Sequence, residues 1–210
     1  MRNKMGFIDI TMPFKNGMAH YPGDPPFMAE PLMCLEDGDD ANLMRLCFGT
    51  HTGTHFDAPY HMIADGKKAD EYPADYFCGR ARVAEFLHND GIERKNLTGA
   101  GIKAGDIVLL KTQQSANMCH AQHDNRHVSL EASAARYLAD MRIRALGIDC
   151  MSIECGPGFE AHHILLGVGI PIIEGLYLHA VRPGLYRMTA MFLNITGADA
   201  APLRAILHKD

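Results

Sequence analysis

The sequence predicts a single mixed α/β (α+β) domain over residues 1–210, built on a β-rich mixed sheet with few helices. Short runs of β-branched and apolar residues alternate with segments rich in Gly and Asp, which are typical of loops. Only two segments have helical character. The chain has 210 residues, 47% of them hydrophobic, and no linker, repeat or low-complexity block divides it. It is therefore long enough to bury a sizeable core in one domain.

The expected elements follow in order along the chain. Strands are expected at residues 7–11, 42–49, 81–87, 106–111, 145–149 and 170–174. A helix is expected from Ser129 to Met141, with Ser129 as its N-cap. Its apolar face would consist of Leu130, Ala134, Tyr137 and Leu138. A second helix is expected over residues 159–166, ended by Gly167 and followed at once by a strand.

Composition excludes several classes of function. The formal net charge is −5 and Lys and Arg form no cluster, which argues against nucleic acid or an anionic membrane as a partner. The longest apolar run, residues 164–173, is interrupted by two glycines and a proline and is shorter than the ~20 residues that cross a bilayer. The first residues lack the hydrophobic region of a secretory signal. The six cysteines form no Cys-x-x-Cys pair, so we expect a cytoplasmic protein with reduced thiols.

One segment, HTGTHFDAPYH over residues 51–61, concentrates the side chains that bind divalent transition metals. Its candidate ligands all fall on odd positions and would share one face of a strand: His51, His55, Asp57 and His61. A straight strand would separate His51 from His55 by about 13 Å. The chain must therefore bend between them, and Gly53 permits the bend.

Two other interpretations compete for this segment. A helix would also bring His51 and His55 together, but residues 52–54 are weak helix formers and Pro59 favours extended geometry before it. Each histidine could instead serve the structure independently, at a turn or at the edge of the core. Four candidate ligands on one face, with a bend-permitting glycine between two of them, favour the metal site.

A second pair of candidate ligands lies far along the chain. His162 falls in the second expected helix, and Glu174 ends the strand that follows it. A helix, a glycine and a strand can fold back so that their outer ends meet, which would place both side chains at one ion. Glutamate at the end of an apolar strand is otherwise unusual, because charges are seldom buried unless they are paired or bound to metal. The alternative is that Glu174 emerges into solvent. His163 points about 100° away from His162 and is expected at the surface.

Other arrangements compete with this metal site. Residues 119–127 contain Cys119, His120, His123 and His127, which could hold zinc but lie in a polar segment. Cys155 could be a nucleophile with His162 as its base. No Gly-x-Ser-x-Gly elbow of a serine hydrolase is present. A non-catalytic metal-binding protein is the remaining alternative, and unfolding upon chelation would favour it.

The pattern His-x-Gly-Thr-His-x-Asp-x-Pro-x-His resembles the signature of the cyclase-like metal hydrolases, which include kynurenine formamidase of tryptophan catabolism and isatin hydrolase. The resemblance extends from IDITMP (8–13) and YPGD (21–24) through HHILLGVGIPIIEGL (162–176) to PLRAIL (202–207). It implies a swivelling β/β/α cyclase-like fold and a homo-oligomer, dimer or tetramer. It also implies a second metal position at His162 and Glu174, with Asp57 bridging two ions.

The ligand set indicates the chemistry. His51, His55 and Asp57 would hold an ion, zinc or manganese, and leave a position open for water. One or two ions per chain are expected. The ion lowers the pKa of its water towards about 7. We assign His61 as general acid/base because an imidazole titrates near neutral pH, with metal ligation as the alternative.

The expected reaction is hydrolysis of an amide-type bond in a small aromatic molecule, as the resemblance implies. The bond would be an N-formyl group, as in N-formylkynurenine, or a cyclic amide or lactone, as in isatin-type substrates. Tryptophan is absent, so an aromatic wall must come from Phe, Tyr or His. Candidates for the substrate pocket are Phe14, Tyr21, Phe56, Tyr60 and the loop over residues 113–115.

Overall fold

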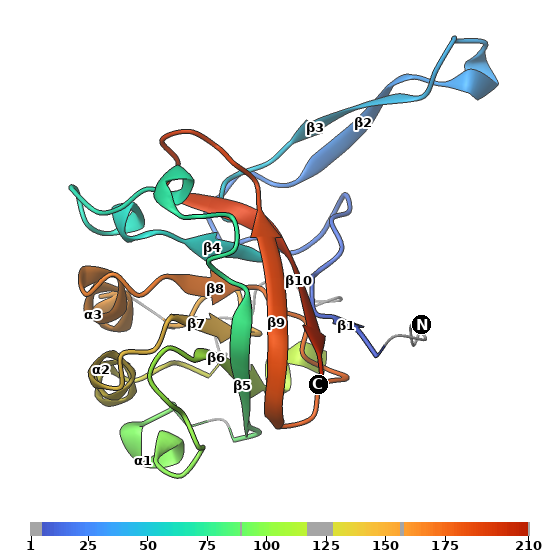
Figure 1. Cartoon of the computed structure of the whole chain (residues 1–210). Helices are drawn as coiled ribbons and strands as arrows, with labels where there is room; N and C mark the ends of the chain where they lie inside the picture. Colours follow the sequence, from blue (N-terminus) through green and yellow to red (C-terminus); the bar gives the residue numbers. More distant parts are fainter. Residues whose placement is uncertain (1–5, 89, 117–127, 156–157, 210) are drawn as a thin grey trace.

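A computed structural model describes residues 6–88, 90–116, 128–155 and 158–209 of the chain. In these residues one large sheet has the strand order β1-β10-β4-β8-β7-β6-β5-β9, and β9 also pairs with β10, so the sheet closes on itself (Figure 1). Its strands are β1 (Ile8–Asp9), β4 (His55–Asp57), β5 (Gly79–Phe86), β6 (Ile107–Thr112), β7 (Ala145–Ile148), β8 (Ile172–Glu174), β9 (Gly184–Phe192) and β10 (Ala200–His208). A separate hairpin consists of β2 (Met28–Met33) and β3 (Leu43–Cys47).

Three helices lie together on one side of the sheet (Figure 1). They are α1 (Arg94–Leu97), α2 (Ala132–Asp140) and α3 (Glu160–Gly167). Single 3-10 turns occur at Leu35–Asp37, Pro59–His61, Ala69–Glu71 and Gln113–Ala116. No helix in the described ranges combines the length and apolar character needed to span a membrane.

Strands β5, β6, β7 and β8 run parallel to one another, as expected when helices connect them. The sequence Ile107–Leu110 is apolar throughout because both faces of β6 are buried. One core cluster fills the inside of the closed sheet around Phe56 and Phe77. A second lies between the sheet and the helices. The two clusters fix the strand ends that carry the site.

The six expected strands and two helices are present, with shifted ends. The first helix starts at Ala132 and not at the expected cap Ser129. The reason is that the preceding residues are held in extended form: Leu130 N–H donates to Ile153 O and Glu131 N–H to Ile92 O. Ser129 instead accepts a hydrogen bond from Cys155 N–H. The second helix, Glu160–Gly167, extends one residue beyond the expected end and starts one residue later than expected.

Candidate metal centre

The bend predicted at Gly53 is present and positions the first ligands. Gly53 has φ 64°, and a Cβ there would lie 2.4 Å from Cε1 of Phe14, so glycine is required. Only His55 and Asp57 share the short strand β4, whereas His51 lies in the turn before it and His61 in the 3-10 turn after it. The expectation of one strand face for all four is therefore wrong. The turns nevertheless bring the four side chains together.

Asp57 is the centre of the cluster. Its Oδ1 lies 2.9 Å from Nδ1 of His51 and 3.3 Å from Nε2 of His55. Its Oδ2 faces the other way, 3.9 Å from Nε2 of His162. Asp57 is 1% exposed, so this carboxylate is almost fully removed from water.

Glu174 and His162 join the same cluster. Strands β4 and β8 are antiparallel, with His55 directly opposite Glu174. The Glu174 carboxylate lies 3.8 Å from Nε2 of His55 and 3.3 Å from Nε2 of His162. Because Glu174 is 4% exposed, the alternative in which it emerges into solvent is wrong. The helix, glycine and strand do fold back as the sequence predicts.

Two of the imidazoles are oriented by bonds outside the cluster. His55 Nδ1 lies 2.9 Å from Gly53 O, and His162 Nδ1 lies 2.7 Å from Oε2 of Glu154. In both rings the Nδ1–H donates, so Nε2 is the ring nitrogen that faces the cluster. Glu154 also accepts the backbone N–H groups of Ala161 and His162, and so fixes the first turn of α3.

The residues fit a metal ion. Among the described residues, His55 Nε2 and both carboxylate oxygens of Asp57 are buried without a well-aligned hydrogen bond, although His51 Nδ1 lies 2.9 Å from Asp57 Oδ1. Buried polar atoms are rarely left unpaired, so these atoms are suited to bind a cation. Ligand atoms within 4.8 Å of one another occur in two groups, His51–Asp57–His61 and His55–Asp57–Glu174. Two atoms bound to one tetrahedral ion lie ~3.4 Å apart, given bonds of about 2.1 Å. The cluster has this spacing.

Asp199 is a site residue that sequence reasoning missed. Its Oδ2 lies 2.9 Å from Nε2 of His51 and 3.3 Å from Nδ1 of His61, and its Oδ1 accepts from the Thr50 hydroxyl. Asp199 immediately precedes β10, which pairs with β4. The backbone N–H of Ala58 donates to Asp199 O, which fixes this position beside the motif. A lone Asp in a turn gives no spacing signal; only the pairing of β10 with β4 reveals it. Glu154 is missed because it too is a single acidic residue without a spacing signal.

Charges within the cluster control its protonation. Burial alone would lower the pKa of His51, but the carboxylates of Asp57 and Asp199 outweigh burial and raise it to about 11. Burial alone would also lower the pKa of His162, but the carboxylates of Glu154 and Glu174 outweigh burial and raise this pKa to about 10. Burial alone would raise the pKa of Asp57, but the neighbouring His51 and His55 hold this pKa well below its usual value. In the metal-free protein protons thus occupy positions that an ion would take.

We therefore expect apparent metal affinity to rise with pH. The charged His51 stabilises the metal-free fold below its unfolded pKa of about 6.5, and this stabilisation is lost as pH rises towards about 11. Between pH ~6 and ~8 an ion must displace that proton, so affinity should increase about tenfold per pH unit for each proton released. Titration against a fluorescent chelator measures the affinity at each pH, and calorimetry in buffers of different ionisation enthalpy measures the number of protons released. Affinity that does not change with pH, after correction for the chelator, would contradict this protonation.

A pocket opens onto the cluster. Besides the ligand residues, its walls are formed by Met12, Ala19, Tyr21, Asp24, Met62, Met151, Ser152 and Phe159. Phe159 has φ 47°, a strained conformation for a residue other than glycine, and its ring centroid lies 5.7 Å from that of His162. Because the chain has no tryptophan, Tyr21 and Phe159 supply the aromatic wall of the pocket.

Of the residues expected in the substrate pocket, Tyr21 alone is among the described lining. Phe56 is wrong: it is 0% exposed and packs in the core, because side chains alternate along β4 and those of His55 and Asp57 take the other face. Phe14 packs against Phe27 and Phe48. Tyr60 lies outside the pocket under the ammonium of Lys68. In the loop over residues 113–115, Ser115 is buried against Asp149.

His163, the neighbour of the candidate ligand His162, is exposed, as expected. Cys155 is not among the described residues that line the pocket, and both ring nitrogens of His162 face carboxylates, at Glu154 and Glu174. That leaves no nitrogen of His162 for a cysteine. The Cys119–His127 cluster lies outside the described residues.

The closed sheet, the helices on one side and the buried His–carboxylate cluster define the protein as one of the metal-dependent hydrolases with a cyclase-like fold. The chain belongs to the cyclase family: the model of that family, described as "Putative cyclase", matches residues 8–155. Kynurenine formamidase from Bacillus cereus is 34% identical over 204 residues, covering 96% of this chain and 97% of its own.

Solved structures agree with this assignment. A predicted metal-dependent hydrolase from Bacillus stearothermophilus has a TM-score of 0.84 at 32% identity, covering 97% of this chain and 98% of its own. Isatin hydrolase A from Labrenzia aggregata has a TM-score of 0.86 at 22% identity, covering 97% and 93%. The second likeness concerns the fold alone. The cyclase-like fold expected from the sequence is confirmed.

Proposed function

We propose that this enzyme hydrolyses the formamide bond of an arylformamide of the N-formylkynurenine type. The protein is a metal-dependent hydrolase of amide bonds in small aromatic molecules. The observation that carries the proposal is Asp57, a buried carboxylate whose oxygens make no well-aligned hydrogen bond and lie between two groups of candidate ligands. The relatives named kynurenine formamidase match over nearly the whole chain, which supports the formamide as substrate.

In the proposed site His51, His55 and Asp57 would hold one divalent ion, and Asp57, His162 and Glu174 would hold a second. Nitrogen and carboxylate ligands suit zinc and manganese, at one or two ions per chain. When bound, such an ion lowers the pKa of water and polarises a carbonyl group. Glu154 and the Gly53 carbonyl keep the two Nε2 atoms aimed at the site.

His61 acts as general acid/base in this proposal. Its Nδ1–H donates to Asp199, which leaves Nε2 free to take a proton. Nε2 would accept the proton of the attacking water and deliver it to the nitrogen of the broken C–N bond. The products are formate and an arylamine. Asp199 would stabilise the imidazolium between the two steps, since its hydrogen bonds with His51 and His61 keep its own pKa well below the usual value.

The pocket walls favour a substrate with an aryl ring and a positive charge. Tyr21 and Phe159 offer ring faces, and Met12, Met62 and Met151 offer flexible apolar contact. Asp24 adds a carboxylate to the wall. We propose that it recognises the α-ammonium of N-formylkynurenine, a group that isatin lacks. Hydrolysis of a cyclic amide or lactone is the second candidate.

A substrate panel tests this assignment. Protein reconstituted with zinc or with manganese is given N-formylkynurenine, formanilide and isatin. We expect the highest kcat/KM for N-formylkynurenine, and Asp24→Asn should raise KM for it about tenfold while leaving formanilide unchanged. Turnover of isatin in preference to both formamides would refute the formamide and favour the cyclic amide.

We also propose that the protein is a cytoplasmic homo-oligomer. Among the described residues, Cys34, Cys47, Cys78 and Cys150 form no disulfide, which supports a reducing compartment. Exposed hydrophobic side chains gathered on the β2–β3 hairpin support self-association.

A further inference from the structure

The segment over residues 151–154, which we call the β7 loop, contacts the candidate site at each position. It comes shortly after β7, which pairs with β8, the strand that ends in Glu174. Its first two side chains line the pocket, and its third residue, Ile153, donates its N–H to Oε1 of Glu174 over 2.7 Å. Its fourth residue, Glu154, lies 2.7 Å from Nδ1 of His162. The β7 loop therefore joins the pocket wall to two candidate metal ligands.

Ser152, the second residue of the β7 loop, has a buried hydroxyl group whose hydrogen-bonding capacity is only partly used. The residue is 3% exposed, and its Oγ accepts a hydrogen bond from the Glu154 N–H at 3.3 Å. Among the residues that the structure describes, its hydroxyl hydrogen has no acceptor. A hydroxyl group can donate as well as accept, and buried polar groups normally use this capacity. Because Ser152 lies in the pocket wall, a molecule bound in the pocket can supply the acceptor.

The neighbours of Ser152 place it at the ligand end of the pocket. Ile153, the next residue in the chain, bonds directly to Glu174. Tyr21 and Asp24 belong to a different part of the wall, on the segment that precedes β2. A substrate whose amide bond lies at the candidate ligands, and whose other groups contact Tyr21 and Asp24, therefore presents its carbonyl group near Ser152.

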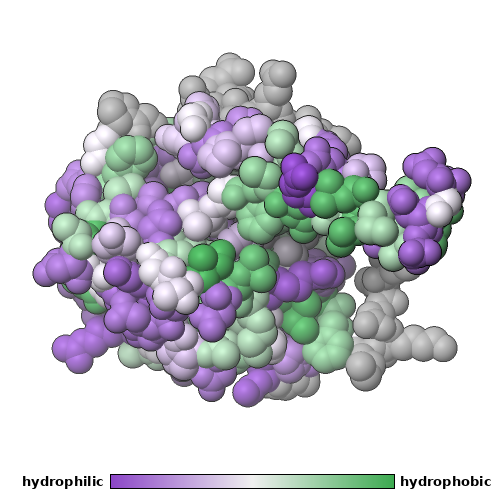
Figure 2. Space-filling model, turned by 90° about the horizontal axis from the view of Figure 1, so that it is seen from above, coloured by the Kyte–Doolittle hydropathy of each residue, from purple (hydrophilic) through white to green (hydrophobic). Residues whose placement is uncertain are grey.

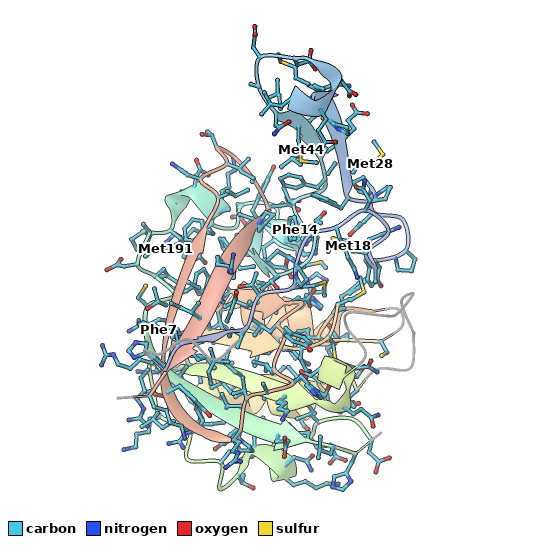
Figure 3. The ribbon with its side chains drawn as sticks, turned by 90° about the vertical axis from the view of Figure 1, so that its right-hand side faces the viewer. Phe7, Phe14, Met18, Met28, Met44 and Met191 are labelled. Atoms are coloured by element: carbon cyan, nitrogen blue, oxygen red, sulfur yellow. The ribbon has the colours of Figure 1, made fainter. Side chains whose placement is uncertain are left out.

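An apolar cluster adjoins this part of the wall. Met12 and Met151, which both line the pocket, pack in the cluster that contains Met18. Phe14 and Met18 lie together below the β2–β3 hairpin (Figure 3), and Figure 2 shows hydrophobic surface where that hairpin leaves the body. A hydrogen bond is electrostatically stronger in apolar surroundings than in water. The hydroxyl of Ser152 can therefore stabilise a negative oxygen more than a neutral one.

We propose that the Ser152 hydroxyl donates a hydrogen bond to the oxygen of the reacting carbonyl group, and that this bond strengthens as the oxygen becomes negative. The proposal rests on the proposed function, in which water attacks the carbonyl carbon of an amide. Ser152 thereby becomes a catalytic residue that contacts the substrate, in addition to the residues that would hold metal and move protons.

The proposed step balances without an added reactant. The water oxygen forms a bond to the carbonyl carbon, and the electron pair of the C=O double bond moves to the oxygen that Ser152 contacts. When the C–N bond breaks, that pair restores the double bond and the nitrogen takes the proton that His61 carried. Ser152 keeps its proton throughout, so it acts as a fixed donor and not as a nucleophile.

The variant Ser152→Ala in the metal-loaded full chain tests the proposal. With N-formylkynurenine, kcat should fall about 10²–10³-fold while KM changes less than about threefold, because the hydrogen bond is strongest in the transition state. Metal content and circular dichroism should match those of the unmodified protein, since Ser152 is not a candidate ligand. The pH dependence of kcat should keep its shape, because Ser152 gives up no proton.

Binding provides a readout that does not depend on turnover. N-phenylphosphoramidate carries a tetrahedral anionic group like that of the intermediate, and calorimetry should show that Ser152→Ala binds it at least about tenfold more weakly. Binding of kynurenine, which lacks the formyl group, should not change. Ser133→Ala is the matched control and should retain full activity and binding. Ser133 also accepts a backbone N–H, that of Arg94, but it is exposed and is not among the described residues that line the pocket.

Unchanged kcat in Ser152→Ala, a rise in KM alone, or an equal loss in Ser133→Ala would overturn the proposal. If Ser152→Ala loses metal or fails to fold, Ser152→Cys decides, because a thiol has similar size but is a weaker donor. A folded, metal-loaded Ser152→Cys should lose at least about tenfold in kcat, and full kcat would contradict the hydrogen bond.

Failure of the proposed function would be recognised separately. If the unmodified protein hydrolyses isatin and neither formamide, the formamide substrate is refuted. The same comparison of variants with isatin then tests Ser152, because the reacting group of isatin is also a carbonyl. Binding of N-phenylphosphoramidate to the unmodified protein and to Ser152→Ala tests the donor whichever substrate is hydrolysed, and equal affinity would overturn the proposal.

Discussion

Replacing Asp57 by Asn should remove both metal binding and hydrolysis. One carboxylate serves both ligand groups, with its oxygens 2.9 Å from His51, 3.3 Å from His55 and 3.9 Å from His162. Asparagine keeps the shape but offers one oxygen, and its NH₂ group cannot ligate a cation. We expect bound metal to fall by at least half and kcat/KM to fall by roughly 10³-fold or more. Elemental analysis and steady-state kinetics measure the two effects.

The control for this variant is Asp75→Asn, which neutralises an exposed carboxylate on the same chain. It should retain full metal content and activity. Thermal unfolding of the metal-free proteins separates a ligand role from a folding role, because metal-free Asp57→Asn must remain folded for its metal content to be informative. Normal metal occupancy and turnover in folded Asp57→Asn would show that the ion, if any, lies elsewhere.

His61→Ala should reduce kcat by about 10²–10⁴ while metal content stays unchanged. The reason is that His61 bonds to Asp199 and its free nitrogen is available for proton transfer. His163→Ala is the matched control, since His163 is exposed next to a ligand and should have little effect. Because His61 ligand atoms also lie within 4.8 Å of those of His51 and Asp57, a structure of His61→Ala with an emptied metal position would establish the alternative role.

Much of the site was predictable from the sequence because its ligands are concentrated in one motif. Gly53 marks the bend by its position between two histidines, and the structure gives it φ 64°. The pairing of His162 with Glu174 also follows from sequence, since a buried glutamate at a strand end needs a cation. Which residues hold an ion stays a prediction.

The rest could not be predicted because it depends on strand pairing between distant segments. Strands β9 and β10 carry weak local signals: β9 contains Gly184, two methionines and one alanine, and β10 contains Pro202 and three alanines. Their pairing with β4 and β5 closes the sheet and delivers Asp199 to His51 and His61. Phe56 stands between two ligands in sequence, which predicts a place in their pocket, but side chains alternate along β4 and that of Phe56 points into the core.

The most direct test of the account is the metal content of the purified protein, measured together with hydrolysis of N-formylkynurenine before and after chelation. The purified protein should contain one to two zinc or manganese ions per chain. Chelation should abolish hydrolysis while circular dichroism shows an intact fold, and either metal should restore activity. Absence of a bound transition metal even after reconstitution, or full hydrolysis by the metal-free protein, would contradict it.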